Sequence, residues 1–410
     1  MEEKQIQTSQ KGRITALDRT RGLCILLMLL GAGIGFFQAF GPVFRLFSDT
    51  RSLRVPLVAS IYFADFAVPC FLSMVGMSYT ISFHKRYEKV GKKAYLHFLF
   101  RYLIFLGMGS IMVSAEYLVN GRKDPLLLLP ILMFLVFAFG LMVLVQKLCF
   151  PKAKKAGSLM MKGLCGSVAL LGVIGILLGI VDCVYQFTSP EEVNDIYANS
   201  MMHWSILHAI GMAGIWGLLY APLSLKNKLI TFFSVGAVYT LLESLPGRME
   251  YFSIYVLGGF VGTIGWSLAL LAGMILMELY LLPGKKGAYG FMLFLLVDFI
   301  LMVPALLFLP ASSRGVSSNF LLMTIVFYGF LFCVSVWTDG WKPRLKPLTL
   351  LGRNPLISFG IGVLFKAVLI VWDPAPETPI WAAFLFFLLA GTVEFSVVSY
   401  LDKKGKSIHI

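Results

Sequence analysis

Ionisable side chains inside long apolar runs are the residues of this sequence that could do chemistry. Burying a charge in hydrocarbon is costly, so a residue of this kind usually serves a function or pairs with another. Asp182 and Glu243 lie near the ends of their runs, where water reaches them. Asp298 and Glu394 lie deeper, and Lys366 is a candidate partner for either. For these three residues, an ion pair that fixes helix packing and a proton path are both open interpretations.

A histidine and an aspartate are the candidate catalytic residues. His208 lies about a turn and a half into the apolar run that starts at 203, where imidazole could act as a general base near neutral pH. His203 is five residues away, which is not the spacing that puts two side chains on one helical face, so a zinc site is not expected. Asp65 in SIYFADFAVPCF (60–71) could orient a histidine or an attacking hydroxyl. The alternatives are a core histidine and an aspartate bonded to a neighbouring helix.

The first apolar run is preceded by the charged segment LDRTRG (17–22). Asp18 and Arg21 are three residues apart, so they share a helical face and can pair with each other. Arg13 and Arg19 are explained as topology anchors, since basic residues gather at the cytoplasmic ends of membrane helices.

A second charged segment, KPLTLLGRNPLISFG (346–360), stands before a late apolar run. Asn354 suits a helix N-cap and Pro355 suits the first helical turn. Backbone N–H groups at such a helix start, beside Arg353, would form an anion site. The alternative is a capped helix with a basic anchor.

Membrane helices must position these residues, because the composition is far from that of a soluble domain. Of 410 residues, 58% are hydrophobic and 14% are charged, and the mean hydropathy is +0.82; soluble domains carry about 25% charged residues. A crossing helix needs about 20 apolar residues. Runs near this length occupy 22–41, 57–83, 96–118, 125–149, 163–186, 203–223, 229–245, 252–282, 288–310, 319–337, 355–372 and 379–400. The seventh run is the shortest, so we expect an all-α polytopic membrane bundle of about 11 or 12 transmembrane helices.

Basic residues are distributed unevenly between the loops on the two sides of these runs. Segments on the side of the N-terminus carry 27 of the 35 Lys and Arg residues, the opposite segments carry seven, and Lys366 lies inside a run. Cytoplasmic loops are enriched in Lys and Arg, so both termini are expected in the cytoplasm. This distribution accounts for most of the net charge of +14, and no nucleic-acid partner is expected.

The loops are short, so the sequence predicts a single transmembrane domain over residues 1–410. Its cytoplasmic parts would be an N-terminal segment, 1–21, and a tail, 401–410. The six cysteines lie in or beside apolar runs and form no CxxC pair, so neither disulfides nor a metal site is expected. No cleavable signal peptide is recognised, and the default expectation is a prokaryotic plasma (inner) membrane.

Four segments in sequence order resemble the heparan-α-glucosaminide N-acetyltransferase-like transmembrane acyltransferases. They are LDRTRGLCILLMLL (17–30), ADFAVPCFLSMVGMS (64–78), ILHAIGMA (206–213) and LGRNPLISFG (351–360). They are similar to the family's LDxxRG start of the first span, its ADLxFPxFxFxxG-like second span, its ILHxIG-like helix and its C-terminal GxN segment. The resemblance covers roughly residues 13–365.

By this resemblance the protein is a membrane enzyme that takes an acyl group from cytosolic acetyl-CoA. It would pass the group to a hydroxyl or amine, usually of a sugar, on the far side of the membrane. Asp65 matches the family's second-span aspartate. The residues expected to hold CoA at the cytoplasmic rim are Asp18, Arg21, Gly22, Arg353 and Asn354.

The stretch before Asp65 departs from the family pattern. Family members with known acetyltransferase activity carry a histidine shortly before this aspartate, and often Asn or His late in the first span. LFSDTRSLRVPLVASIYFAD (46–65) has no histidine, and LLGAGIGFF (29–37) has neither residue. Either His208 supplies the base, with Asp65 orienting or polarising, or the chain does a different job on the same scaffold.

The sequence is therefore compatible with two functions. The first is a transmembrane acyltransferase, with acetyl-CoA as donor and a carbohydrate or lipid-linked glycan as acceptor. The second is a transporter, or a non-catalytic lipid- or glycan-handling membrane protein, which is favoured by the missing histidine and by the ionisable residues within the runs. Membrane lipid is a partner in both cases, and a homodimer is an open alternative to a monomer.

Overall fold

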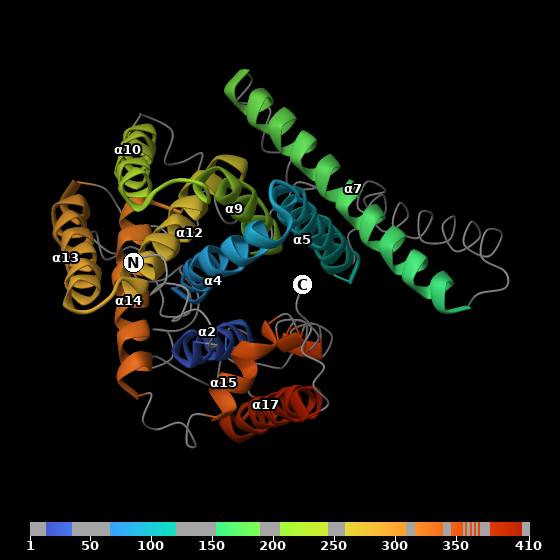
Figure 1. The fold of residues 1–410 in the computed structure, drawn as a ribbon. Coiled ribbons are helices and arrows are strands. Elements are labelled where there is room, and N and C mark those ends of the chain that lie inside the picture. Colours follow the sequence, from blue (N-terminus) through green and yellow to red (C-terminus); the bar gives the residue numbers. More distant parts are fainter. Residues whose placement is uncertain are drawn as a thin grey trace.

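A computed structural model of the chain describes residues 14–34, 66–119, 153–188, 206–244, 259–308, 316–338, 346–355 and 378–403, with parts of 357–369. This part of the chain is helical and contains no strand, which confirms the all-α class. Its helices are α2 (Thr15–Ile34), α4 (Ala67–Val90), α5 (Lys93–Val119), α7 (Ala153–Thr188), α9 (Ile206–Tyr220), α10 (Leu225–Ser244), α12 (Gly259–Leu281), α13 (Lys285–Phe308), α14 (Ser318–Trp337), α15 (Lys346–Arg353) and α17 (Ile380–Lys403) (Figure 1).

Several of these helices have the length and composition of membrane spans. Within the described ranges, five helices qualify, over Lys93–Ile111, Gly259–Leu281, Lys285–Ala305, Ser318–Trp337 and Trp381–Lys403. The expected membrane class is thereby supported, whereas the 11 or 12 crossings and the cytoplasmic termini remain predictions. Helix α2 begins at Thr15, so LDRTRG lies inside the helix, as the expected pairing of Asp18 with Arg21 on one helical face requires.

Helix α12 occupies the centre of the bundle. It contacts α4, α9, α10, α13 and α14, which surround it (Figure 1). Apolar residues cover all sides of this helix, and Trp266, Leu270 and Met274 are fully buried. A helix that is apolar all round is expected in the interior of a bundle. Helix α12 is therefore the core element against which the other helices are positioned.

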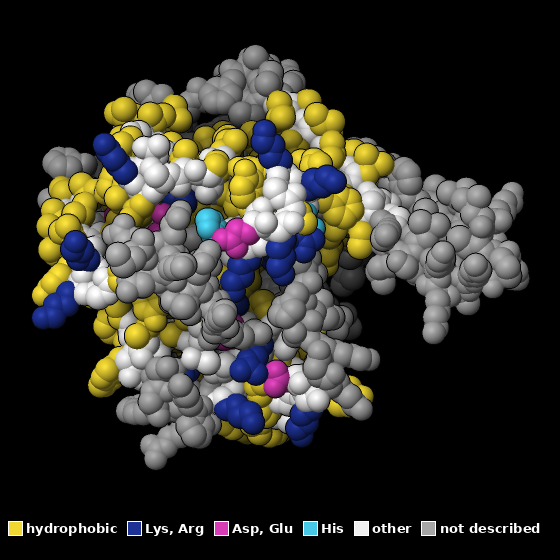
Figure 2. Space-filling model, in the orientation of Figure 1, with side chains coloured by type: hydrophobic (Ala, Val, Ile, Leu, Met, Phe, Trp, Pro, Cys, Tyr) yellow, Lys and Arg dark blue, Asp and Glu magenta, His cyan; other side chains and the backbone are white. Residues whose placement is uncertain are grey.

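Helices at the periphery expose large apolar side chains instead. On α13, Leu293 is 60% exposed, and on α17 Leu388 is 57% exposed. In Figure 2, hydrophobic side chains gather in the upper and left parts of the face shown, with Lys and Arg side chains among and below them. Apolar surface of this extent is what a bundle presents to lipid rather than to water.

Two smaller groups of helices flank the central bundle. Helix α5 packs against α7 and α9, and α15 packs against α2 and α17 (Figure 1). The second group matters most for function, since it brings the LDRTRG segment at one end of the sequence against the LGRNP segment at the other.

Candidate functional site

Helices α2 and α15 meet at two glycines. A Cβ atom added to Gly22 would lie 1.9 Å from the carbonyl oxygen of Leu348, and one added to Gly352 would lie 1.7 Å from the carbonyl oxygen of Asp18. Only glycine permits backbones to approach so closely, as small residues do in membrane helices generally. The predicted rim residues Gly22 and Asp18 therefore lie directly against Gly352, the neighbour of Arg353.

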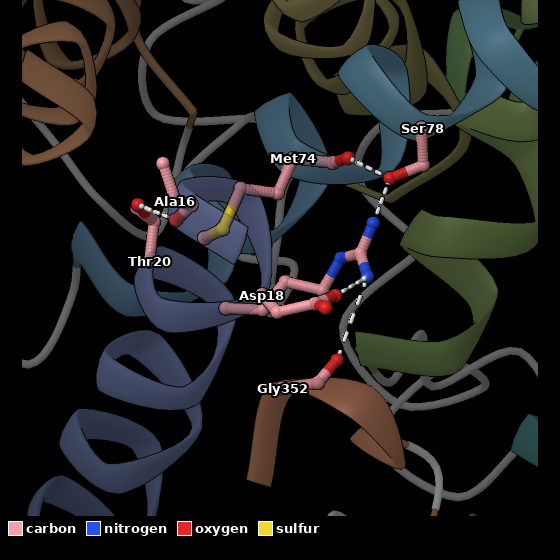
Figure 3. A network of polar contacts seen from close by, with 7 residues as sticks. Ala16, Asp18, Thr20, Met74, Ser78 and Gly352 are labelled. Atoms are coloured by element: carbon pink, nitrogen blue, oxygen red, sulfur yellow. Dashed lines mark hydrogen bonds and ion pairs between the residues drawn. The ribbon is translucent and has the colours of Figure 1, made fainter. Parts of the chain in front are cut away.

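Arg21 ties this junction to a third helix (Figure 3). Its Nη1 donates to Asp18 Oδ1 at 3.2 Å and to the carbonyl oxygen of Gly352 at 3.4 Å, and its Nη2 donates to Ser78 Oγ of α4. Ser78 Oγ donates in turn to the carbonyl oxygen of Met74 at 2.6 Å. The guanidinium thus links α2, α4 and α15, and its side chain is only 15% exposed. The pairing of Asp18 with Arg21 that the sequence predicts is confirmed.

Arg19 and Thr20 connect the same end of α2 to α14. Arg19 Nη1 donates to the carbonyl oxygen of Ser335 at 2.9 Å, and Thr20 Oγ1 donates to Ser335 Oγ at 2.8 Å. Both side chains are buried. Arg19 is thus a buried residue that bonds to the backbone of a neighbouring helix, and its role as a topology anchor stays a prediction.

Arg353 and Asn354 have contrasting surroundings. Arg353 Nη1 donates to Asp402 Oδ1 of α17 at 3.1 Å, and its side chain is 32% exposed. Asn354 is fully buried, and neither polar atom of its side chain has a hydrogen-bond partner among the described residues. The backbone carbonyl of Asn354 accepts from the N–H of Ser358 at 3.1 Å, so a helical turn does begin there.

Asn354 takes the N-cap position of this turn, but no backbone N–H of a described residue donates to its side-chain oxygen, so the expected side-chain cap is not found among the described residues. The physical reason is the path of the chain. An N-cap residue is normally entered from an extended segment, but α15 runs as far as Arg353 and the N–H of Asn354 bonds back to Leu351 at 3.2 Å. The junction thus places a buried amide with unused hydrogen-bonding capacity next to a partly exposed arginine.

His208 lies away from this junction, in the first turn of α9. The side chain is 4% exposed, and its Nε2 is 3.0 Å from Ser110 Oγ of α5. Ser110 Oγ is also 3.3 Å from the carbonyl oxygen of Leu106, to which it can donate. Whether Nε2 accepts or donates toward Ser110 depends on the tautomer of the ring. The arrangement joins an imidazole to a hydroxyl inside the bundle, between α5 and α9.

The intramembrane carboxylates fall into two kinds. Glu243 accepts from the backbone N–H of Ser318 at 2.9 and 3.1 Å and from Ser318 Oγ at 2.6 Å, so it caps the start of α14. Asp298 is fully buried, and neither of its carboxylate oxygens has a hydrogen-bond partner in the described part of the chain. Glu394 is 1% exposed, and its Oε1 has no such partner either.

Three predicted residues lie outside what the structure describes. Asp65 precedes the first described residue of its segment, and the side chains of Asp182 and Lys366 are not described. The proposed roles of Asp65 beside a base and of Lys366 beside Asp298 or Glu394 therefore stay predictions.

The sequence did not predict the hydroxyl and backbone groups that contact Arg21 and His208. Ser78 and Ser110 lie within apolar helices, where a single serine gives no distinctive pattern. It also missed the ion pair between Lys228 of α10 and Glu278 of α12, which lines a pocket of about 270 Å³. A Lys and a Glu from different helices carry no spacing signal, although both adjoin basic segments at the predicted cytoplasmic side.

No protein-family model and no curated protein matches this chain. The four segments that resemble the transmembrane acyltransferases are thus the whole basis for relating the chain to that family.

Proposed function

We propose that the protein is a transmembrane acyltransferase that moves an acyl group from cytosolic acyl-CoA to a sugar or glycan acceptor. The observation that carries the proposal is the contact between His208 and Ser110, in which a buried imidazole lies 3.0 Å from a hydroxyl. Acyl transfer needs a group that removes the acceptor's proton as its oxygen or nitrogen attacks. Imidazole is the side chain suited to that task near neutral pH.

Two residues have the roles of base and proton relay in this proposal. His208 is the base, and Ser110 of a second helix relays the proton to it: the Ser110 hydroxyl gives its proton to His208 Nε2 and takes the acceptor's proton in its place. A base positioned in this way contributes typically about 10²–10⁴-fold to the rate. Asp65, which the family resemblance implicates, remains the expected polarising residue.

The donor would be held at the junction of α2 and α15. Acetyl-CoA supplies the acyl group as an activated thioester. Arg353 is the partly exposed cation that could exchange Asp402 for a phosphate, because guanidinium pairs well with both anions. Asn354 offers a buried amide without a partner among the described residues. The other predicted rim residues have positioning roles, since their contacts hold the junction together: Asp18, Arg21 and Gly22.

The test is incubation of the purified protein with radiolabelled acetyl-CoA and a panel of glycan acceptors, including a lane without acceptor. We expect acceptor-dependent appearance of label in one glycan class. Absence of transfer to every acceptor, from protein that is folded and monodisperse, would contradict the proposal.

A second candidate function is transport, and one observation favours it. Asp298 lies within a helix long enough to span a membrane, and both of its carboxylate oxygens lack partners among the described residues. Buried carboxyl groups of this kind mark ion and proton pathways. Binding of a glycan to the protein without transfer of label in the same assay would support this alternative.

A further inference from the structure

An apolar groove of about 510 Å³ lies between α10 and α13, with α12 and α14 beneath it. Its walls include Phe232 and Ala237 of α10 and Leu301 of α13, and its floor includes Leu268 of α12 and Ile325 of α14. Its volume falls in the range of about 300–1,000 Å³ that is typical of ligand pockets. The groove is separate from His208 and from the junction of α2 and α15, none of whose residues line it.

The two ends of the groove differ in polarity. At one end the ring of Phe294 lies 5.4 Å from that of Phe232 and 6.4 Å from that of Phe233, so this end is aromatic. At the other end, Thr240 Oγ1 donates to Ser318 Oγ at 2.9 Å. Thr240 follows Phe232 by eight residues, which corresponds to about 12 Å along the helix.

The polar end of the groove lies near the C-terminal end of α10 and the N-terminal end of α14. Helix α10 ends at Ser244, and α14 begins at Ser318 under the cap formed by Glu243. The ends of membrane helices lie toward the membrane–water interface, so Thr240 and Ser318 lie on the interface side of the groove. The aromatic end, at Phe232, lies further from these helix ends and closer to the middle of the hydrocarbon. An amphiphile aligned with this gradient has its polar part near Thr240 and its apolar part toward Phe232.

The groove opens on a surface that faces hydrocarbon. Helices α12, α13 and α14 are all long and apolar enough to span a membrane. On the outer side of α13, Leu293, Leu296 and Ile300 are each more than half exposed. Figure 1 shows α10 and α13 on the same side of α12. Lipid chains are therefore the molecules that surround the opening.

We propose that this groove binds one acyl chain of a membrane phospholipid, with the headgroup end of the chain near Thr240 and Ser318 and its methyl end near Phe232. Burial of the chain against two apolar walls and an apolar floor distinguishes this site from the outer face of α13, where a lipid touches only one surface. The inference is independent of acyl transfer, because no residue of the proposed active site takes part.

A glycine in the wall provides the test. A Cβ at Gly236 would have no atom within 4 Å, so Gly236→Phe fills the groove without displacing backbone. Gly391 of α17 also has open space around its Cβ position and does not line the groove, so Gly391→Phe is the matched control. Ala237→Phe changes the same wall as Gly236→Phe and serves in its place if that variant does not purify as a monodisperse protein.

The experiment uses the full chain in vesicles of phosphatidylcholine that carries a photoactivatable acyl chain, with adducts mapped by peptide mass spectrometry. In the unsubstituted protein, we expect adducts to concentrate on 232–241 and 318–325 relative to Leu293, Leu296 and Ile300. Gly236→Phe should reduce the groove adducts to the level of that outer face, while Gly391→Phe leaves them unchanged. Even labelling of groove and outer face, or groove labelling that survives both wall substitutions, would overturn the proposal.

Discussion

Substitution of Gly352 by alanine tests whether the junction of α2 and α15 depends on backbone contact. The added Cβ would lie 1.7 Å from the carbonyl oxygen of Asp18 and 2.9 Å from the backbone nitrogen of Gly22. These are backbone atoms, so no side-chain rotation relieves the overlap, and the two helices must separate. Overpacking costs about 1–3 kcal/mol and occasionally more. An overlap with backbone atoms at 1.7 Å places this substitution at the upper end of that range, about 3 kcal/mol. Alanine recovers about 1 kcal/mol of helix propensity, so we expect a net loss of about 2 kcal/mol in the free energy of unfolding.

The measurement is the thermal unfolding midpoint in detergent. It is monitored as the loss of the monodisperse peak in size-exclusion chromatography after heating. At about 2.1 cal/mol/K of unfolding entropy per residue, a loss of about 2 kcal/mol corresponds to a decrease of about 2 °C for a single domain of 410 residues. Gly391→Ala is the control, because no atom lies within 4 Å of its Cβ position and only the propensity gain applies. A midpoint for Gly352→Ala equal to or above that of Gly391→Ala would refute the close contact of α2 with α15.

The two kinds of buried carboxylate predict opposite responses to amide substitution. Glu243→Gln should lower the unfolding free energy by about 1.5–3 kcal/mol, because a charge-assisted acceptor is lost from the Ser318 N–H and hydroxyl. Asp298→Asn should leave the midpoint unchanged or raise it, since no hydrogen bond to a described residue is lost and the burial of a carboxyl group is relieved. Thermal unfolding of both variants beside the unsubstituted protein decides the comparison, and a larger loss for Asp298→Asn than for Glu243→Gln would contradict the assigned contacts.

Local sequence patterns were sufficient for the helical class and for the bounds of some helices. The predicted run at 319–337 corresponds closely to α14 (Ser318–Trp337), because an unbroken apolar run bounded by polar loops defines both. The Asp18–Arg21 pair was also predictable, since its two members lie one helical turn apart. The surroundings of the charged residues at the start of α2 were not predictable, however. The composition of LDRTRG does not reveal that Arg19 is buried and bonds to the backbone of α14.

The tertiary partners of the candidate site could not be read from the sequence. Ser110 is 98 positions from His208, and Gly352 is 331 positions from Arg21. Neither pair has a periodic relation, so only the packing of α5 on α9 and of α15 on α2 brings them together. The lack of a partner for the Asn354 side chain among the described residues is equally invisible in the sequence, which favoured a capping role.

The most direct test of the central claim compares two histidine variants in the acetyl-transfer assay. Glutamine at position 208 can still hydrogen-bond to Ser110 but cannot take up a proton, so His208→Gln should lower the transfer rate by about 10²–10⁴-fold. His84→Gln is the control, because the side chain of His84 is 64% exposed and 3.5 Å from Glu88 on the same helix; its rate should match that of the unsubstituted protein. Transfer by His208→Gln at the unsubstituted rate would contradict the assignment of His208 as the base.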